Sequence, residues 1–220
     1  MGEKSLHNQI KNWYSKPGDQ LEVSLNKYII DIIRDELFIE IQTRNFSAIK
    51  EKLNHLLKDH KIRLIYPISL LKWIVRINRD GETVKSRRRS PKKGRLEDVF
   101  NELIYIPKLL SNPNFEIEVL FIHSEDIFWD DGKGSWRRKR WSLSDRRLLK
   151  VISNQIIKTP EDFRRIIMEN IEEGFTTRQF ARQKKLPISL ARKTVYCMRK
   201  MGFIKETGKK GRSPEYSKTY

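Results

Sequence analysis

The chain has 220 residues, enough for one large domain or two small ones. Its 46 Lys and Arg residues against 28 Asp and Glu residues give a formal net charge of +18, so we expect a polyanionic partner, nucleic acid first and a membrane surface second. No apolar run approaches the roughly 18 residues of a membrane span, which excludes a transmembrane helix. The single cysteine, Cys197, excludes an internal disulfide and a cysteine zinc cluster, and it fits a reducing, intracellular compartment.

Hydrophobic periodicity predicts an α/β first half. Leu6, Ile10 and Trp13 recur at helical spacing, and the alternation over residues 21–25 is typical of a strand. In chain order we expect a helix over 3–14, strands over 21–25, 28–33 and 37–43, a helix capped by Ser47, strands over 61–68 and 73–78, a helix over 96–110 and a strand over 115–122. This order predicts a mixed sheet that helices cover at least in part.

Two strongly basic segments interrupt this pattern. Seven of the eleven residues in 85–95 are Lys or Arg and none is acidic, a density that predicts a loop or arm. In 133–141, Trp136 and Trp141 flank four consecutive cations, which can stack on bases or bind phosphate, or form a solvated linker whose tryptophans pack on one domain. We therefore expect a first domain over 1–128, a basic linker over 129–141 and a second domain over 142–220.

The second domain is predicted to be small and α+β, helical up to a final hairpin. In chain order we expect a helix over 148–152 capped by Ser144, a helix that starts at Thr159 and Pro160, a short helix that Thr176 and Thr177 cap and that ends near Lys185, a helix over 190–201, and two strands on either side of the basic turn 207–212.

Asp31 and Glu40 interrupt two apolar strands that a short turn joins. Side chains alternate along a strand, so Glu40 and Gln42 share one face while Ile39 and Ile41 occupy the other. A buried carboxylate is costly without a compensating cation, and Mg²⁺ or Mn²⁺ is the cation that a small oxygen cluster prefers. The alternative is that both acids are surface residues on a half-exposed sheet.

Glu3 on the first helix, Asp31 on a strand and Glu40-Ile41-Gln42 on the next strand give residues 1–125 a pattern that resembles the PD-(D/E)xK nuclease superfamily. This restriction-endonuclease-like fold includes archaeal Holliday junction resolvases and TnsA-type transposon endonucleases. The resemblance implies that Asp31 and Glu40 ligate Mg²⁺ or Mn²⁺ and that Glu3 supports the ion, directly or through water. Glu3 can instead simply stabilise the first turn of its helix.

Gln42 departs from the superfamily pattern, which usually has a lysine there to orient the water and offset charge in the transition state. We expect Gln42 to orient the water, and the positive charge can come from Arg44, Lys50 or Lys52. His7, on the first helix, can carry a proton or hydrogen-bond a phosphate, or it can be a partly buried structural residue.

Residues 142–220, and best 160–220, are similar to a winged helix-turn-helix. Between 178 and 218 there are thirteen Lys or Arg residues against Glu206 and Glu215, which favours DNA over the alternative of a protein–protein module. In this fold a recognition helix, here 190–196, docks in the major groove, and a basic wing touches phosphates. Together with the two basic segments, the expected DNA-binding residues are Arg87, Arg88, Arg89, Arg137, Arg138, Arg140, Arg178, Arg192, Lys193, Lys209, Lys210 and Arg212.

These observations predict a metal-dependent DNA endonuclease that hydrolyses phosphodiester bonds in repair, recombination, transposition or defence, with catalytic residues Glu3, Asp31, Glu40 and Gln42. A first alternative is a catalytically inactive DNA-binding regulator on a nuclease fold, which Gln42 favours. A second is an RNA nuclease or RNA-binding protein. The expected location is the cytoplasm of a prokaryote, in association with the nucleoid. Cutting both strands of a duplex often needs two active sites, so the sequence is compatible with a homodimer.

Overall fold

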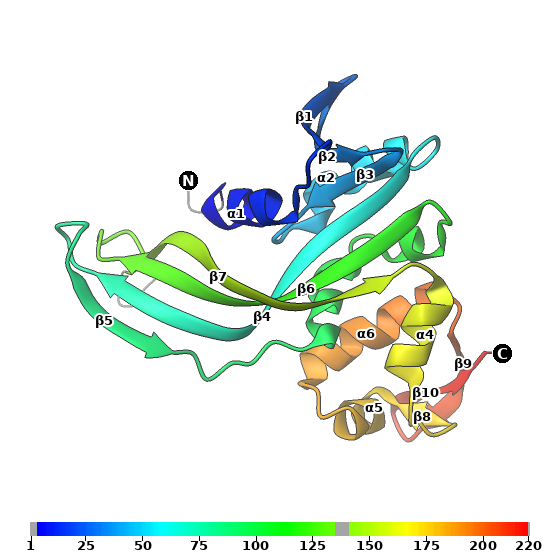
Figure 1. Cartoon of the computed structure of the whole chain (residues 1–220). Coiled ribbons are helices and arrows are strands. Elements are labelled where there is room, and N and C mark those ends of the chain that lie inside the picture. The colour runs from blue at the N-terminus through cyan, green and yellow to red at the C-terminus, as the bar shows by residue number, and fades with distance from the viewer. Residues whose placement is uncertain (1–3, 135–140, 220) are drawn as a thin grey trace. The chain divides into compact units, whose positions relative to one another are not determined.

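The computed structural model describes residues 4–134 and 141–219 (Figure 1). The chain is mixed α/β with one large sheet, which confirms the predicted class at that level. It divides into two compact units, each assembled from segments that are distant in sequence. Unit 1 is Met1–Thr43, Leu64–Arg95 and Glu118–Gln155, and unit 2 is Arg44–Arg63, Leu96–Ile117 and Ile156–Tyr220. The predicted domain borders at 128 and 142 stay a prediction.

The large sheet follows the order β1-β2-β3-β4-β6-β7 among the described strands, and β5 pairs with β4. Its elements and the helix on it are α1 (Lys4–Tyr14), β1 (Gln20–Leu25), β2 (Tyr28–Arg34), β3 (Leu37–Ile41), β4 (Lys61–Ile77), β5 (Val84–Arg89), β6 (Phe115–Trp129) and β7 (Ser142–Ile157). The pairs β1–β2, β2–β3 and β4–β5 are antiparallel. The N–H of Ile62 bonds Asn114 and that of Asp130 bonds Ile77, so β4 and β6 run in the same direction and the sheet is mixed.

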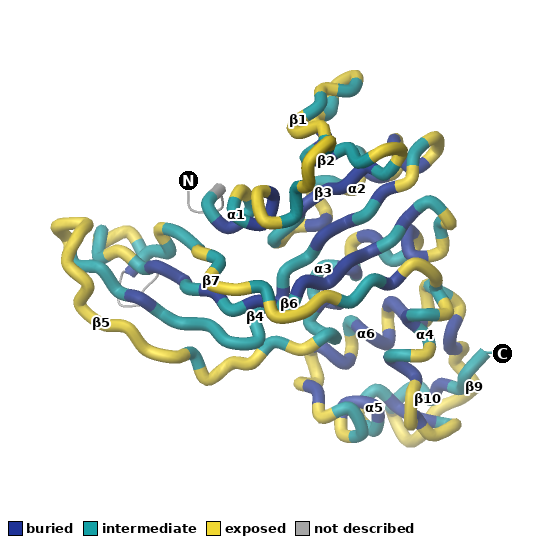
Figure 2. Tube along the Cα trace, in the orientation of Figure 1, coloured by how far each residue is buried: buried dark blue, intermediate teal, exposed yellow. Residues whose placement is uncertain are grey.

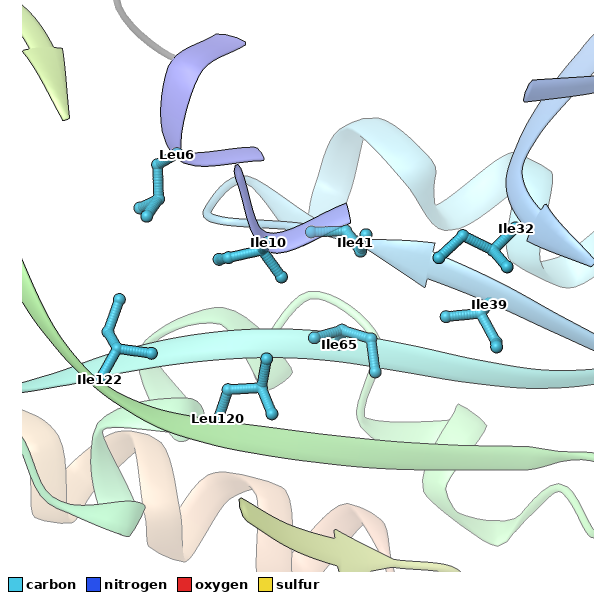
Figure 3. Close-up of a cluster of buried hydrophobic side chains, with 8 residues drawn as sticks. All are labelled: Leu6, Ile10, Ile32, Ile39, Ile41, Ile65, Leu120 and Ile122. Carbon is cyan, nitrogen blue, oxygen red and sulfur yellow. The ribbon is translucent and has the colours of Figure 1, made fainter. Parts of the chain in front are cut away.

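The core of unit 1 lies between α1 and the sheet (Figure 3). Leu6 and Ile10 of α1 point at isoleucines and a leucine from neighbouring strands, all of them almost fully buried. The strand members of this cluster are Ile32, Ile39, Ile41, Ile65, Leu120 and Ile122. Each side chain of this size contributes roughly 1.5–3 kcal/mol when it is fully removed from water, so this contact fixes α1 on the sheet.

Unit 2 contains the remaining helices and a small sheet of β8, β10 and β9. Its elements are α2 (Phe46–Leu56), the 3₁₀ turn η1 (Leu96–Val99), α3 (Phe100–Leu103), the 3₁₀ turn η2 (Pro107–Ser111), α4 (Pro160–Met168), β8 (Phe175–Thr176), α5 (Thr177–Gln183), α6 (Ile188–Lys200), β9 (Ile204–Lys210) and β10 (Ser213–Lys218). Phe100 packs edge-to-face on Phe163 at 5.9 Å between ring centroids, and Phe175 contacts Phe180 and Tyr216. These aromatic contacts form the core of this unit.

Several predicted elements are confirmed. Two of the helices begin with capping boxes formed by residues that are close in sequence. Thr159 accepts a hydrogen bond from the Asp162 N–H and forms a capping box at the start of α4. Thr176 and Gln179 form a second capping box at the start of α5. The helix over 4–14, the first three strands, the helix after Pro187 and the C-terminal hairpin also form where the sequence predicts them.

Two basic or polar segments predicted to be loop or helix are strands. Residues 84–89 form β5 rather than a free arm, because alternate side chains leave on opposite faces and Arg87 is neutralised by Glu125. Residues 142–157 form β7 rather than a helix capped by Ser144. Asn154 bonds Glu118 and Arg146 pairs with Asp126 across to β6, so long-range pairing overrides the local preference. Figure 2 shows β5 exposed along its length.

The predicted break in β4 is absent, and the strand is continuous from Lys61 to Ile77. Ser69 keeps the backbone extended there, since its hydroxyl bonds Ser124 at 2.7 Å and its carbonyl accepts from Gly94 at 2.9 Å. β6 likewise continues to Trp129, beyond the predicted end at 122.

Two helix predictions also need correction. The predicted helix 96–110 is a series of short turns, because Pro107 has no N–H to continue it. The cap before α2 is Asn45 in a left-handed conformation rather than Ser47, whose hydroxyl bonds the Asn45 side chain.

None of the described helices combines the length and the apolar character that crossing a bilayer requires.

We predict that Gly94→Ala destabilises the protein by about 1–3 kcal/mol. A Cβ at Gly94 would lie 2.5 Å from the carbonyl oxygen of Ser69 and 2.6 Å from Ile68 Cγ2, where real contacts do not occur. Urea unfolding of both proteins measures the difference. Gly208→Ala is the matched control, since a Cβ there meets nothing within 4 Å; equal unfolding midpoints for the two variants would contradict the prediction.

We also predict that the Cys197 thiol is protected in the native protein. Burial raises the pKa of Cys197 from 9.0 to about 12, and only the thiolate reacts. The thiolate fraction at pH 8 therefore falls roughly a thousandfold, and labelling by a disulfide reagent should slow by about that factor relative to the urea-unfolded chain. Rapid labelling of the folded protein would show that α6 is not packed as described.

Candidate metal site and nucleic-acid-binding residues

Helix α1 is fixed at several points before any site residue is considered. The Tyr14 hydroxyl donates to Glu118 at 2.6 Å, and Gln9 accepts from the N–H of Leu148 at 2.6 Å. At the C-terminal end, Arg34 donates to both carboxylate oxygens of Asp19 and to the Tyr14 carbonyl. The Arg34 guanidinium holds the pKa of Asp19 below its usual value. The helix is therefore positioned by contacts that do not involve the acids predicted to bind metal.

Asp31 lies where the ladder between β2 and β3 ends. The last paired residues are Ile32 and Ile39, so Asp31 and Glu40 are the next residues along the two strands, just past the paired region. Asp31 Oδ2 accepts the N–H of Ile41 at 2.8 Å. The Asp31 side chain thus accepts a hydrogen bond from the backbone of Ile41, the residue after Glu40, and this bond orients the Asp31 carboxylate.

Glu40 is 5% exposed, so the alternative of two surface acids does not hold for this residue. Ile39 and Ile41, which flank it, belong to the apolar cluster under α1. Burial of the isoleucines on one face fixes the register of β3, as the alternation of the sequence predicts.

His7 contacts Asp31 directly. Its Nε2 lies 3.2 Å from Asp31 Oδ2, and its Nδ1 lies 3.5 Å from the Asn8 side-chain oxygen. The hydrogen bond to Asp31 raises the pKa of His7 above 6.5, and partial burial opposes this rise. The sequence placed His7 on the correct helix but gave no means of pairing it with Asp31, because the two residues are 24 positions apart.

Lys11, one helical turn after His7, is a buried cation. Its ammonium group bonds the carboxylate of Glu22 on β1. The pairs Leu21–Ile32 and Val23–Ile30 bracket Glu22 and Asp31, so these two acids face each other across β1 and β2. Sequence analysis did not single out Lys11, although its i+4 spacing from His7 was a usable signal.

The described residues do not include a group of three or more His, Cys, Asp and Glu side chains gathered tightly enough to hold a metal. The third acid of the prediction, Glu3, lies outside the described residues. Asp31 and Glu40 still fit a hard divalent ion, because Mg²⁺ keeps several waters and needs one or two protein carboxylates.

Gln42 follows β3, and its N–H donates to the Ile65 carbonyl at 2.9 Å, so pairing with β4 extends one residue past the strand. Arg44, Lys50 and Lys52, the predicted sources of positive charge, belong to unit 2. Lys11 is a cation of unit 1 that pairs with Glu22 one helical turn from His7.

The three arginines of β5 have different surroundings. Arg87 pairs with Glu125 at 2.6 Å and lies 5.1 Å from the centre of the Trp73 ring. Arg88 and Arg89 are exposed and make no side-chain hydrogen bond or ion pair with other described residues. Arg76 and Lys85 lie over Trp141, one of the two tryptophans considered for base stacking. Trp136, Arg137, Arg138 and Arg140 lie outside the described residues.

The other predicted DNA-binding residues belong to unit 2. Lys193 is only partly exposed, and its ammonium group donates a hydrogen bond to the Asn101 side chain of α3 at 2.9 Å. The remaining residues are exposed on α5, on α6 and on the β9–β10 hairpin, and they are Arg178, Arg192, Lys209, Lys210 and Arg212.

Comparison with known proteins identifies a family without assigning an activity. Residues 4–158 match the family model described as "Domain of unknown function (DUF8091)". A protein of Treponema pallidum (strain Nichols), which has the name "Uncharacterized protein", is 29% identical over 223 residues, covering 98% of this chain and 85% of the relative. No solved structure matches the chain. Because the family model spans more than half of its length, the chain belongs to the DUF8091 family.

Proposed function

We propose that the protein is a metal-dependent DNA endonuclease that hydrolyses phosphodiester bonds, acting in repair, recombination, transposition or defence. The observation that supports this most is that Asp31 and Glu40 are the first residues past the Ile32–Ile39 pair on two adjacent strands, with Asp31 oriented by the Ile41 N–H. Two carboxylates in an otherwise basic protein suit a site that must hold a cation against a polyanion.

In this proposal Asp31 and Glu40 hold Mg²⁺ or Mn²⁺, which supplies an activated water and charge stabilisation at the phosphorus. Gln42 orients the water by hydrogen bonding, and Glu3 completes the set of carboxylates. Lys11, which pairs with Glu22 on β1, places a positive charge one helical turn from His7. Because Asp31 is held by the Ile41 N–H and by His7 of α1, this carboxylate needs little reorganisation to bind the ion.

The proposal includes a restriction-endonuclease-like fold for the first domain and a winged helix-turn-helix for the second. The sequence of α5, a short turn and α6, followed by the basic hairpin β9–β10, supports the latter. Exposed Arg192 on α6 and Lys209, Lys210 and Arg212 on the hairpin suit contacts with a duplex and its phosphates. DNA as partner, a homodimer, and a nucleoid-associated location in a prokaryotic cytoplasm belong to the same proposal, and the bacterial relative supports the prokaryotic setting.

A second candidate is a catalytically inactive DNA-binding regulator on the same fold. Gln42 favours it, because glutamine cannot supply the charge of the lysine usual at that position in the PD-(D/E)xK superfamily. Asp31 and Glu40 would then be structural acids, with His7 the side-chain partner of Asp31. Cleavage assays separate the two candidates.

We predict that Asp31→Asn and Glu40→Gln each reduce Mg²⁺- or Mn²⁺-dependent cleavage of DNA by roughly a hundredfold or more, because each removes a charged metal ligand. Supercoiled, nicked, single-stranded and branched substrates test this under identical conditions. Glu36→Gln, an exposed acid in the β2–β3 turn, should cleave like the wild type. If the wild-type protein cuts none of these substrates with either ion, the regulator is the better interpretation.

We predict that DNA binding weakens steeply with salt, with log K falling by about 0.9 for each phosphate contact. Replacing Arg192, Lys209 or Lys210 by Gln should each lower the slope of log K against log salt by about one, since each removes one contact. Fluorescence anisotropy without divalent ions measures the slopes. Lys58→Gln, an exposed cation after α2, is the control. A salt-independent affinity would exclude a phosphate-based interface.

A further inference from the structure

We propose that His7 is a ligand of the divalent ion together with Asp31, and that the site therefore takes a transition-metal ion such as Mn²⁺ or Co²⁺ in preference to Mg²⁺. This inference rests on the proposed function, in which Asp31 binds metal. It adds a nitrogen donor from α1 to a site predicted to have oxygen donors alone.

The separation of the two donor atoms supports this assignment. Nε2 of His7 and Oδ2 of Asp31 are 3.2 Å apart. Two adjacent ligands that each lie about 2.0–2.2 Å from one ion, as nitrogen and oxygen donors do, are separated by roughly 3 Å in octahedral geometry and somewhat more in tetrahedral geometry. The side chains therefore need little movement to share an ion.

The chemistry of the two facing atoms gives a second argument. Nδ1 of His7 lies 3.5 Å from the side-chain oxygen of Asn8, which can only accept a hydrogen bond, so this nitrogen is the donor in that contact. Asp31 Oδ2, a carboxylate oxygen, is also an acceptor, so Nε2 contacts it either through a ring N–H or through a shared metal ion. Metal-binding histidines generally donate their other ring nitrogen to an oxygen in this way.

The site is also accessible and independently supported. The His7 and Asp31 side chains are 26% and 16% exposed, so an ion can reach them from solvent. The apolar contacts of Leu6 and Ile10, with the hydrogen bond from Tyr14 to Glu118, hold α1 in place without His7. Asp31 is oriented by Ile41 rather than by His7 alone. The histidine is therefore not required as a structural anchor.

The metal preference follows from the donor set. Carboxylates and water suit Mg²⁺ and Mn²⁺ alike, whereas imidazole favours later first-row ions and adds little for Mg²⁺. A site with His7 and Asp31 as donors should thus discriminate among divalent ions in a way that carboxylates alone cannot.

The first test uses the full-length wild-type protein with Mn²⁺ as the probe. Electron spin-echo spectra of bound Mn²⁺ should show modulation from a directly bonded ¹⁴N nucleus, and this modulation should change when histidine is labelled with ¹⁵N. Bound Mn²⁺ without nitrogen coupling would overturn the assignment of His7, even if Asp31 and Glu40 bind the ion.

The second test compares variants by calorimetric titration at one pH. His7→Gln should weaken Mn²⁺ and Co²⁺ binding by roughly ten- to a hundredfold and change Mg²⁺ binding little, whereas Asp31→Asn should weaken all three. His55→Gln, an exposed histidine of α2, is the control, and thermal unfolding checks that each variant folds. If His7→Gln binds Mn²⁺ like the wild type while Asp31→Asn does not, the inference fails and the proposed metal site stands. If the wild type binds none of these ions, both fail.

Discussion

The packing of α1 on the large sheet is the constraint on which the candidate site depends. Leu6 and Ile10 must be buried, and their contacts with the strand cluster set the rotation of the helix about its axis. Helical geometry then places the residues that follow them, His7 and Lys11, about 100° around the helix. These two side chains consequently meet Asp31 and Glu22. The apolar core thus determines which polar groups come together. Burial of Leu6 and Ile10 sets the rotation of α1, and that rotation decides which strand residues His7 and Lys11 contact.

The end of the β2–β3 ladder provides the second element of this arrangement. Beyond Ile32 and Ile39 the two strands no longer form regular pairs, and a backbone N–H would lose its partner. The Asp31 carboxylate accepts a hydrogen bond from the Ile41 N–H. The same carboxylate oxygen also contacts His7. A hydrogen bond to a charged group is worth about 1.5–3 kcal/mol, which helps to offset the cost of burying the carboxylate. Structural and chemical roles of Asp31 are therefore difficult to separate by stability measurements alone.

The sequence predicts the elements whose determinants are local and misses those fixed by distant partners. Thr159 and Thr176 form capping boxes with residues three positions away, and the helices they start were predicted correctly. β7 was predicted as a helix because its determinants are on β6, where Glu118 and Asp126 bond Asn154 and Arg146. The same reasoning applies to the site. The hairpin makes the proximity of Asp31 and Glu40 predictable, whereas the pairing of His7 with Asp31 depends on how α1 docks.

Charge density alone does not decide which cations are available to a polyanion. The acids at the far end of β6 neutralise several of the basic residues beside them, since Glu125 pairs with Arg87 and Asp126 lies between Lys72 and Arg146. A cation held in such a pair must give up its partner before it contacts a phosphate, and part of the interaction energy is then lost. On β5, Arg87 is held in an ion pair with Glu125 of β6, unlike Arg88 and Arg89. Within residues 4–134 and 141–219, Arg88 and Arg89 have no ion pair to break, so under the proposed function β5 serves both as an ordered strand and as a polyanion contact.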